Sequence, residues 1–151
     1  MRLTTWPEVH RHLAATYADV RAERDGVLDI VVPLRDAAAP ATPGAAPLAV
    51  SRTEVLGSTW IDVSSVIGSL RHLSQAEMLA NNAASTIGAF CTRDGELVVR
   101  QRLPLAGLRA ADLDETIRDI AELAAWSRRR LSEMGVPVAP WRGPGDGARR
   151  P

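Results

Sequence analysis

The stretch from Ala76 to Leu113 constrains the fold of this chain more than any other part of the sequence. At its centre, Asp94 and Gly95 stand between two short runs of strand-forming character, Ile87 to Thr92 and Glu96 to Leu103. An Asp-Gly pair supplies the positive φ angles that a two-residue hairpin turn requires. The sequence therefore predicts an antiparallel pair of strands here, with a helix before it and another after it.

The first helix is predicted from a capping box at the start of the chain. Thr5 and Glu8 have the spacing of such a box, and Pro7 suits the first helical turn. Apolar residues then recur at three- and four-residue spacing as far as Val20, which is typical of a helix with one buried face. We expect this helix to end before Gly26.

A second capping box, formed by Ser74 and Glu77, introduces the helix at the start of the informative stretch. The Ala-rich run from Met78 to Ser85 forms its body. Asn81 and Asn82 are expected to end the helix, because a short amide side chain can satisfy terminal backbone groups and tolerates unusual dihedral angles.

The last helix is predicted to begin at Asp112, with Glu115 three positions on, and to end at Gly135, which Pro137 follows. A long amphipathic helix of this kind packs through one apolar stripe and leaves its other side to solvent. The residues that trace the stripe are Leu113, Ile117, Ile120, Ala124, Leu131 and Met134.

Three further strands are predicted in the first half of the chain. Val27 to Leu34 is β-branched and too short for a buried helix, and the Ala- and Pro-rich segment Asp36 to Pro47 that follows reads as a loop. Leu48 to Leu56 and Thr59 to Ile67 flank the Gly57-Ser58 pair, which suits a tight hairpin connection. Their alternation is imperfect, so the register is left open.

The predicted element order is therefore α-β-β-β-α-β-β-α, an α+β single domain with an antiparallel sheet flanked by helices. We expect the domain to cover residues 1–135. Residues 136–151 are rich in Pro, Gly and Arg and are expected to form a disordered tail.

Composition excludes several classes of function. Eighteen basic residues, all Arg, balance eighteen acidic ones, so no general attraction to nucleic acid or anionic membranes is expected. No apolar run approaches the length of a membrane span, and the N-terminus lacks a hydrophobic signal segment. The single cysteine, Cys91, excludes an intramolecular disulfide. We expect a cytoplasmic protein.

Several short motifs resemble those of a known family. Leu79-Ala-Asn-Asn82, Gly88-Ala-Phe90, Asp94-Gly-Glu-Leu97 and Leu103-Pro-Leu105, followed by a long amphipathic helix, are similar to YbjN-like domains and to the type III secretion chaperones that share their fold. The resemblance implies a homodimer that binds an extended protein or peptide client, with no catalysis and no cofactor. Because those chaperones are usually acidic and this chain is neutral, a general YbjN-like peptide-binding module fits better than a dedicated secretion chaperone.

Four aromatic residues are the candidate binding residues. Trp126 lies off the apolar stripe of the last helix on a charged face, as an interface anchor would, and the alternative is that it covers the edge of the sheet. Trp60 is expected to share a strand face with Asp62 and Ser64, either in the core or against a peptide. Trp6 and Tyr17 are expected to lie in the core beneath the first helix, or else to line a client groove.

Catalytic and metal sites lack positive support in the sequence. His10 and His12 are two residues apart on a predicted helix, so they point to opposite sides and cannot share a metal ion. Cys91 has no nearby histidine and is expected to be a buried, inert thiol. The alternative to a chaperone-like module is a structural or regulatory subunit whose last helix docks on one larger protein, with Trp126 as its anchor.

Overall fold

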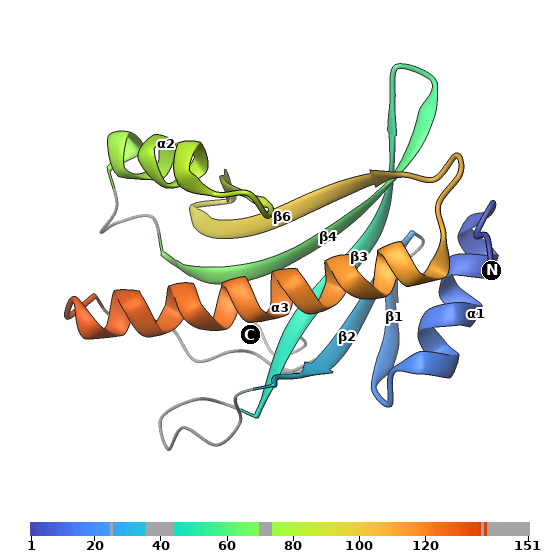
Figure 1. Cartoon of the computed structure of the whole chain (residues 1–151), viewed down its shortest axis with the longest axis horizontal. Helices are drawn as coiled ribbons and strands as arrows, with labels where there is room; N and C mark the ends of the chain where they lie inside the picture. The colour runs from blue at the N-terminus through green and yellow to red at the C-terminus, as the bar shows by residue number, and fades with distance from the viewer. Residues whose placement is uncertain (25, 36–43, 70–73, 137, 139–151) are drawn as a thin grey trace, which may run out of the picture.

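A six-stranded antiparallel sheet flanked by helices forms this protein in a computed structural model that describes residues 1–24, 26–35, 44–69, 74–136 and 138 (Figure 1). The strands lie in the order β1-β2-β3-β4-β6-β5. This arrangement confirms the predicted α+β class. In chain order the elements are α1 (Trp6–Thr16), β1 (Val20–Arg24), β2 (Val27–Pro33), β3 (Ala45–Val55), β4 (Ser58–Ser69), α2 (Gln75–Ala84), β5 (Ala89–Arg93), β6 (Glu96–Pro104) and α3 (Ala110–Glu133).

One face of the sheet carries the apolar core. Buried side chains alternate along the central strands, so that Val50 of β3 lies between its register partners Leu28 and Val63. α3 crosses this face and contacts β2, β3, β4 and β6. Ile117 and Ile120 of α3 are completely buried, which confirms the central part of the predicted apolar stripe.

The first helix is shorter than its sequence predicts. It ends at Thr16, and the chain from Val20 forms strand β1, which pairs with β2. The capping box is present as predicted, since the Thr5 hydroxyl accepts from the Glu8 amide and the Glu8 carboxylate accepts from the Thr5 amide. The helix ends before Gly26 as predicted, but the prediction that helical spacing extends it to Val20 is wrong, because Val20 lies in a strand.

Two tight turns join neighbouring strands. Asp94 and Gly95, with φ angles of 52° and 79°, connect β5 to β6 as predicted. The turn between β3 and β4 consists of Leu56 and Gly57, with φ angles of 50° and 75°, so it lies one residue earlier than predicted. Leu56 is fully exposed at the tip of this hairpin, which projects well beyond the rest of the sheet (Figure 1).

The long helix α3 begins earlier than predicted. Its N-cap is Arg109, which makes no side-chain capping hydrogen bond, and Asp112 lies in the first turn, where it pairs with the Arg109 guanidinium. The helix ends as predicted, because Gly135 adopts a φ of 75° and its amide donates to the Ser132 carbonyl. Met134 departs from the predicted stripe, since it is 63% exposed.

The N-terminal segment is bound to the start of α3 (Figure 1). The Leu3 amide donates to the Leu108 carbonyl at 2.8 Å. On α1, His12 Nε2 lies 2.9 Å from Asp114 Oδ1, and the hydroxyl of Tyr17 lies 3.5 Å from the same oxygen. These polar contacts join α1 and the residue that follows it to the first turns of α3.

Two features predicted from sequence concern residues that are only partly described. Of the predicted tail, Val136 and Val138 pack against the core, and residues 137 and 139–151 lie outside the described residues, as do residues 36–43 of the predicted loop. Across the described ranges, the helices are each too short or too polar to cross a bilayer.

Candidate functional site

Helix α2 forms one wall of the candidate site and is loosely packed. Its capping box is formed as predicted, with Ser74 Oγ accepting from the Glu77 amide at 3.2 Å. Hydrogen bonds from the Ser74 amide and hydroxyl lower the pKa of the Glu77 carboxyl. None of the helix's residues is buried: Met78 is half-buried against the core, while Leu79 is 67% exposed. The helix therefore contributes little apolar area to the fold.

A side-chain amide fastens α2 to the edge of the sheet. Asn82 Oδ1 accepts from the Phe90 amide at 2.6 Å, and Asn82 Nδ2 donates to the Phe90 carbonyl at 3.0 Å. These are the backbone groups of β5 that a further strand would otherwise pair with. The prediction that Asn81 and Asn82 end the helix is wrong, because α2 continues to Ala84. Asn82 instead occupies an edge position of the sheet.

Gly88 allows the chain after α2 to pass close to α3. It adopts a φ of +65°, and a Cβ atom added there would lie 2.8 Å from Ile120 Cδ1 of α3 and 3.2 Å from the Arg100 carbonyl oxygen. Its amide donates to Gln101 Oε1 at 2.7 Å. Only glycine combines this dihedral angle with this close approach. The connection therefore sets how near α2 and β5 lie to α3.

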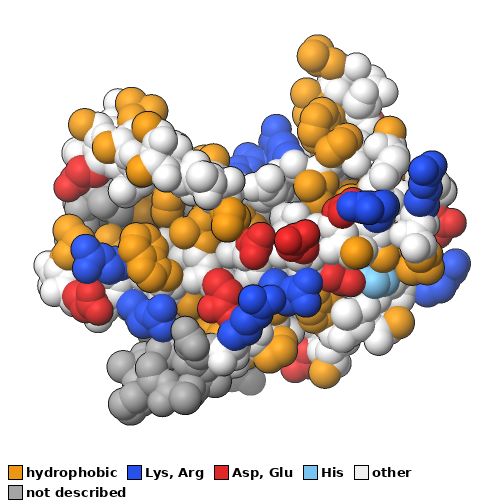
Figure 2. Space-filling view, viewed as in Figure 1, with side chains coloured by type: hydrophobic (Ala, Val, Ile, Leu, Met, Phe, Trp, Pro, Cys, Tyr) orange, Lys and Arg blue, Asp and Glu red, His pale blue; other side chains and the backbone are white. Residues whose placement is uncertain are grey.

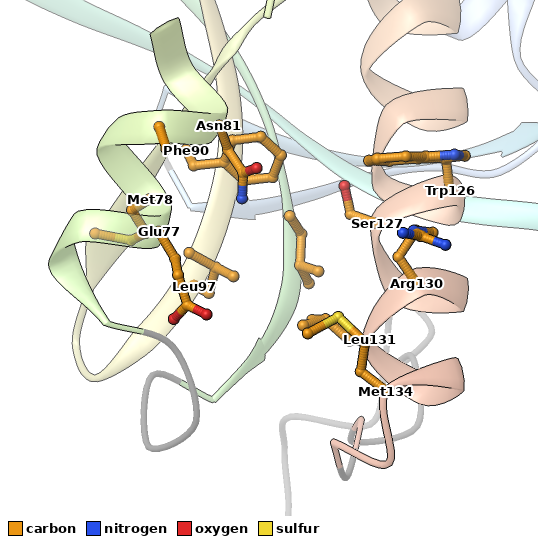
Figure 3. Close-up of a pocket in the computed structure, with 12 residues that line it drawn as sticks. Glu77, Met78, Asn81, Phe90, Leu97, Trp126, Ser127, Arg130, Leu131 and Met134 are labelled. Atoms are coloured by element: carbon orange, nitrogen blue, oxygen red, sulfur yellow. The ribbon is translucent and has the colours of Figure 1, made fainter. Parts of the chain in front are cut away.

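An open pocket of about 280 Å³ lies between α2 and α3, with strands β4, β5 and β6 as its floor (Figure 3). Its surface is mostly apolar, and side chains from α2, α3 and the strands point into it (Figure 3). The residues that line it are Ile67, Glu77, Met78, Ala80, Asn81, Phe90, Leu97, Trp126, Ser127, Arg130, Leu131 and Met134.

Trp126 dominates the α3 wall of this pocket. The side chain is 51% exposed, and the Arg130 guanidinium carbon lies 6.0 Å from the centre of its ring, within the range of a cation–π interaction. Arg130 also pairs with Glu133 at 3.4 Å. With Met134 exposed one further turn along, the rim presents apolar surface to solvent beside one basic side chain.

Two polar side chains of α3 lie against the floor. Ser127 is only 6% exposed, and its hydroxyl has no hydrogen-bond partner among the described residues. Arg128 donates from Nη1 to the Ile67 carbonyl at 2.9 Å, and burial lowers the pKa of its guanidinium to about 10. The Arg128 contact fixes α3 to β4 at the point where the β4–β6 register shifts.

The structure brings one of the four predicted binding residues into the pocket. Trp126 lines it, and its predicted place outside the buried stripe agrees with its exposure. Trp60 is half-buried and lies on the same face of β4 as Asp62 and Ser64, because the three residues are two apart along the strand. Trp6 and Tyr17 are partly buried against the core at α1. Burial, followed by the negative charge of Asp114, raises the pKa of Tyr17 to about 12.

The residues considered for catalysis or metal binding do not come together in one site. Cys91 is half-buried on β5, and burial raises the pKa of its thiol, which disfavours the reactive thiolate. His12 is paired with Asp114 of α3. Among the described residues, no three His, Cys, Asp or Glu side chains are grouped closely enough to hold a metal ion.

Neither the models of known protein families nor the sequences of curated proteins match this chain.

Proposed function

We propose that this protein is a non-catalytic binding module that holds an apolar segment of a client protein in the pocket between α2 and α3. The observation that carries the proposal is the pocket itself, which combines an apolar surface with a half-exposed Trp126. A chaperone-like role of this kind agrees with the resemblance to YbjN-like proteins. We include in the proposal a cytoplasmic location and a homodimeric state.

The exposed part of Trp126 is large enough to matter for affinity. A buried tryptophan removes up to roughly 250 Å² from water, so covering the 51% that is exposed here removes on the order of 120 Å². At about 25 cal/mol per Å², this burial contributes roughly 3 kcal/mol before the costs of association. Met78 and Met134 line the same pocket with flexible side chains, which adapt to apolar groups of different shapes.

A peptide array tests the proposal. Overlapping twelve-residue peptides of varied sequence are screened with the natural protein, with Trp126→Ala, and with Leu56→Ala as the matched control. Leu56 is more exposed than Trp126 but lies on the β3–β4 hairpin, outside the pocket. We expect peptides with clustered large apolar residues to bind, and their binding to be lost only with Trp126→Ala. An array without such enrichment, or equal losses with both variants, would contradict the proposal.

The same surface is compatible with a structural or regulatory subunit bound permanently to one larger protein. The exposure of Trp126 on a helix whose outer face is charged favours this second candidate. Light scattering after co-purification distinguishes the two: a fixed stoichiometry with one partner indicates a subunit, whereas exchangeable clients indicate a chaperone. Light scattering of the purified chain alone tests the proposed homodimer.

A further inference from the structure

Strand β5 covers only half of the edge of β6. On one side, β6 pairs with β4 along its length, from Glu96 opposite Ser69 to Pro104 opposite Trp60. On the other side, its pairing with β5 stops at Arg100. Among the described residues, no strand pairs with the remaining part of β6, residues 101–104, on that side.

The register identifies the backbone groups at this uncovered edge. The Leu105 amide donates to the Thr59 carbonyl, so the odd-numbered residues of β6 direct their backbone groups toward β4. The amide and carbonyl of Arg102 and the carbonyl of Pro104 therefore point away from β4, where β5 is absent. Pro104 has no amide hydrogen, which limits the edge to a short stretch centred on Arg102.

The chain before β5 turns away from this edge. Gly88, with its positive φ, ends the pairing. Ser85 Oγ accepts from the Ile87 amide at 3.3 Å and lies 2.6 Å from the Ile87 carbonyl, to which it donates. Ile87, the residue that would face Arg102 if β5 continued, therefore has its backbone groups satisfied within its own turn.

The surface is hollowed where this edge would be reached. Figure 2 shows a depression between α2 and the projecting β3–β4 hairpin. An extended segment lying in it would continue the line of β5 past its first residue. A short, recessed stretch of strand edge of this kind is suited to strand addition by a peptide.

The charges beside the edge favour an acidic segment. Arg100 and Arg102 both contact Asp62, which is only 8% exposed. Two guanidinium groups thus share one carboxylate, and the cluster carries one excess positive charge. Burial and the neighbouring Arg102 charge lower the pKa of Arg100, which agrees with repulsion between the two cations.

We propose that β6 binds an extended acidic segment of a partner protein, which adds as a short antiparallel strand opposite Arg102. This surface is separate from the α2–α3 pocket and does not depend on the function proposed for it. Cross-strand neighbours in an antiparallel pair share one face of the sheet, so the acidic side chains lie beside Arg102 and Arg100. The amides of the same acidic residues pair with β6.

Amide hydrogen exchange with a designed peptide tests this site. The probe is acetyl-Thr-Asp-Val-Asp-Val-Asp-Thr-amide, and the readout is the exchange rate of the Arg102 amide in the natural protein. Without peptide, Arg102 exchanges fast and its neighbour Leu103 slowly. Saturating peptide slows exchange at Arg102 at least tenfold. N-methylation of the Asp residues removes this protection, whereas N-methylation of the Val residues preserves it.

Charge variants give the second measurement. Arg102→Gln weakens peptide binding roughly twofold to fivefold, the range for an exposed ion pair, and Arg93→Gln, an exposed arginine at the far end of β5, leaves it unchanged. A control peptide carries Asn in place of all three Asp residues. The proposal would be overturned if Arg102 stayed unprotected at saturating peptide, or if the control peptide bound as tightly as the acidic one. Protection of the Arg102 amide without peptide would also overturn the proposal, because another part of this chain would then cover the edge. If that protection rises with protein concentration, a second copy of the chain covers it. Trp126→Ala leaves peptide binding intact, so the two sites are tested independently.

Discussion

Replacing Gly88 by alanine gives a sharp test of how the chain after α2 approaches α3. Two costs are expected. The residue adopts a φ of +65°, which costs a residue with a Cβ about 1–2 kcal/mol. The new methyl group would also lie 2.8 Å from Ile120 Cδ1, and overpacking of this kind costs about 1–3 kcal/mol. Reduced freedom of the unfolded chain offsets about 0.4–1 kcal/mol, so Gly88→Ala is expected to destabilise by about 1–5 kcal/mol.

Two further variants separate these costs. Gly107→Ala keeps the dihedral cost without the contact, because Gly107 has a φ of +82° and no atom within 4 Å of an added Cβ; its loss is expected near 1 kcal/mol. Ile120→Val deletes the clashing Cδ1 atom and costs about 0.5–1.5 kcal/mol on its own. In the double variant Gly88→Ala/Ile120→Val, the losses are expected to fall short of additivity by about 1–2 kcal/mol.

Equilibrium urea unfolding measures the natural protein and the four variants under one set of conditions. The free energies of unfolding are compared only if the dependence on urea concentration is unchanged among them. Strict additivity in the double variant would refute the steric argument. A loss for Gly88→Ala no larger than that for Gly107→Ala would show that α3 moves aside freely, and that the spacing across the pocket is not fixed at Gly88.

Three further outcomes are expected. Asn82→Ala leaves the backbone groups of Phe90 without their side-chain partner and lowers the free energy of unfolding by about 1–2 kcal/mol. The substitution is expected to speed amide exchange more in α2 than in β4. Trp126→Ala lowers the free energy of unfolding by roughly 1–3 kcal/mol, because about half of the side chain is buried; a loss above about 4 kcal/mol would show it to be a core residue. Because burial raises the pKa of Tyr17 from 10.0 to about 12, the folded state holds a proton that the unfolded chain releases, so stability falls as pH rises across this range. Thermal unfolding of Tyr17→Phe lacks that part of the decline, and identical pH profiles would refute the assignment.

Local signals in the sequence predict the elements that depend on local geometry. Asp94 and Gly95 adopt the positive φ angles expected of their residue types, and both capping boxes form. Leu56 occupies a left-handed position that Asn or Gly normally occupies, so Gly57 predicts a turn before β4 but places it one residue too late. The start of α3 after Arg109 could not be predicted from a capping motif, because no side chain caps this end of the helix.

Strand β1 and the pocket depend on contacts between separate elements, which the spacing of apolar residues within one segment does not report. Val20 continues the helical spacing of α1, yet it pairs with Ile30 of β2. The exposed Trp126 is predictable because it falls among charged residues on its helix, whereas the pocket also needs Met78 and Phe90 from elements distant in sequence. Met134 has the spacing of a buried residue but lies past the sheet that would cover it, so it is exposed.

The attachment of α2 by the Asn82 amide has a thermodynamic consequence for the pocket. A helix without buried residues loses little apolar burial when it separates from the sheet, so its detachment costs far less than global unfolding. A molecule that fills the pocket contacts this helix as well as α3 and adds its own burial to the docked arrangement. Occupancy and helix docking are therefore linked equilibria, and slowed amide exchange across Gln75–Ala84 would reveal a bound client even where its affinity is too weak to isolate the complex.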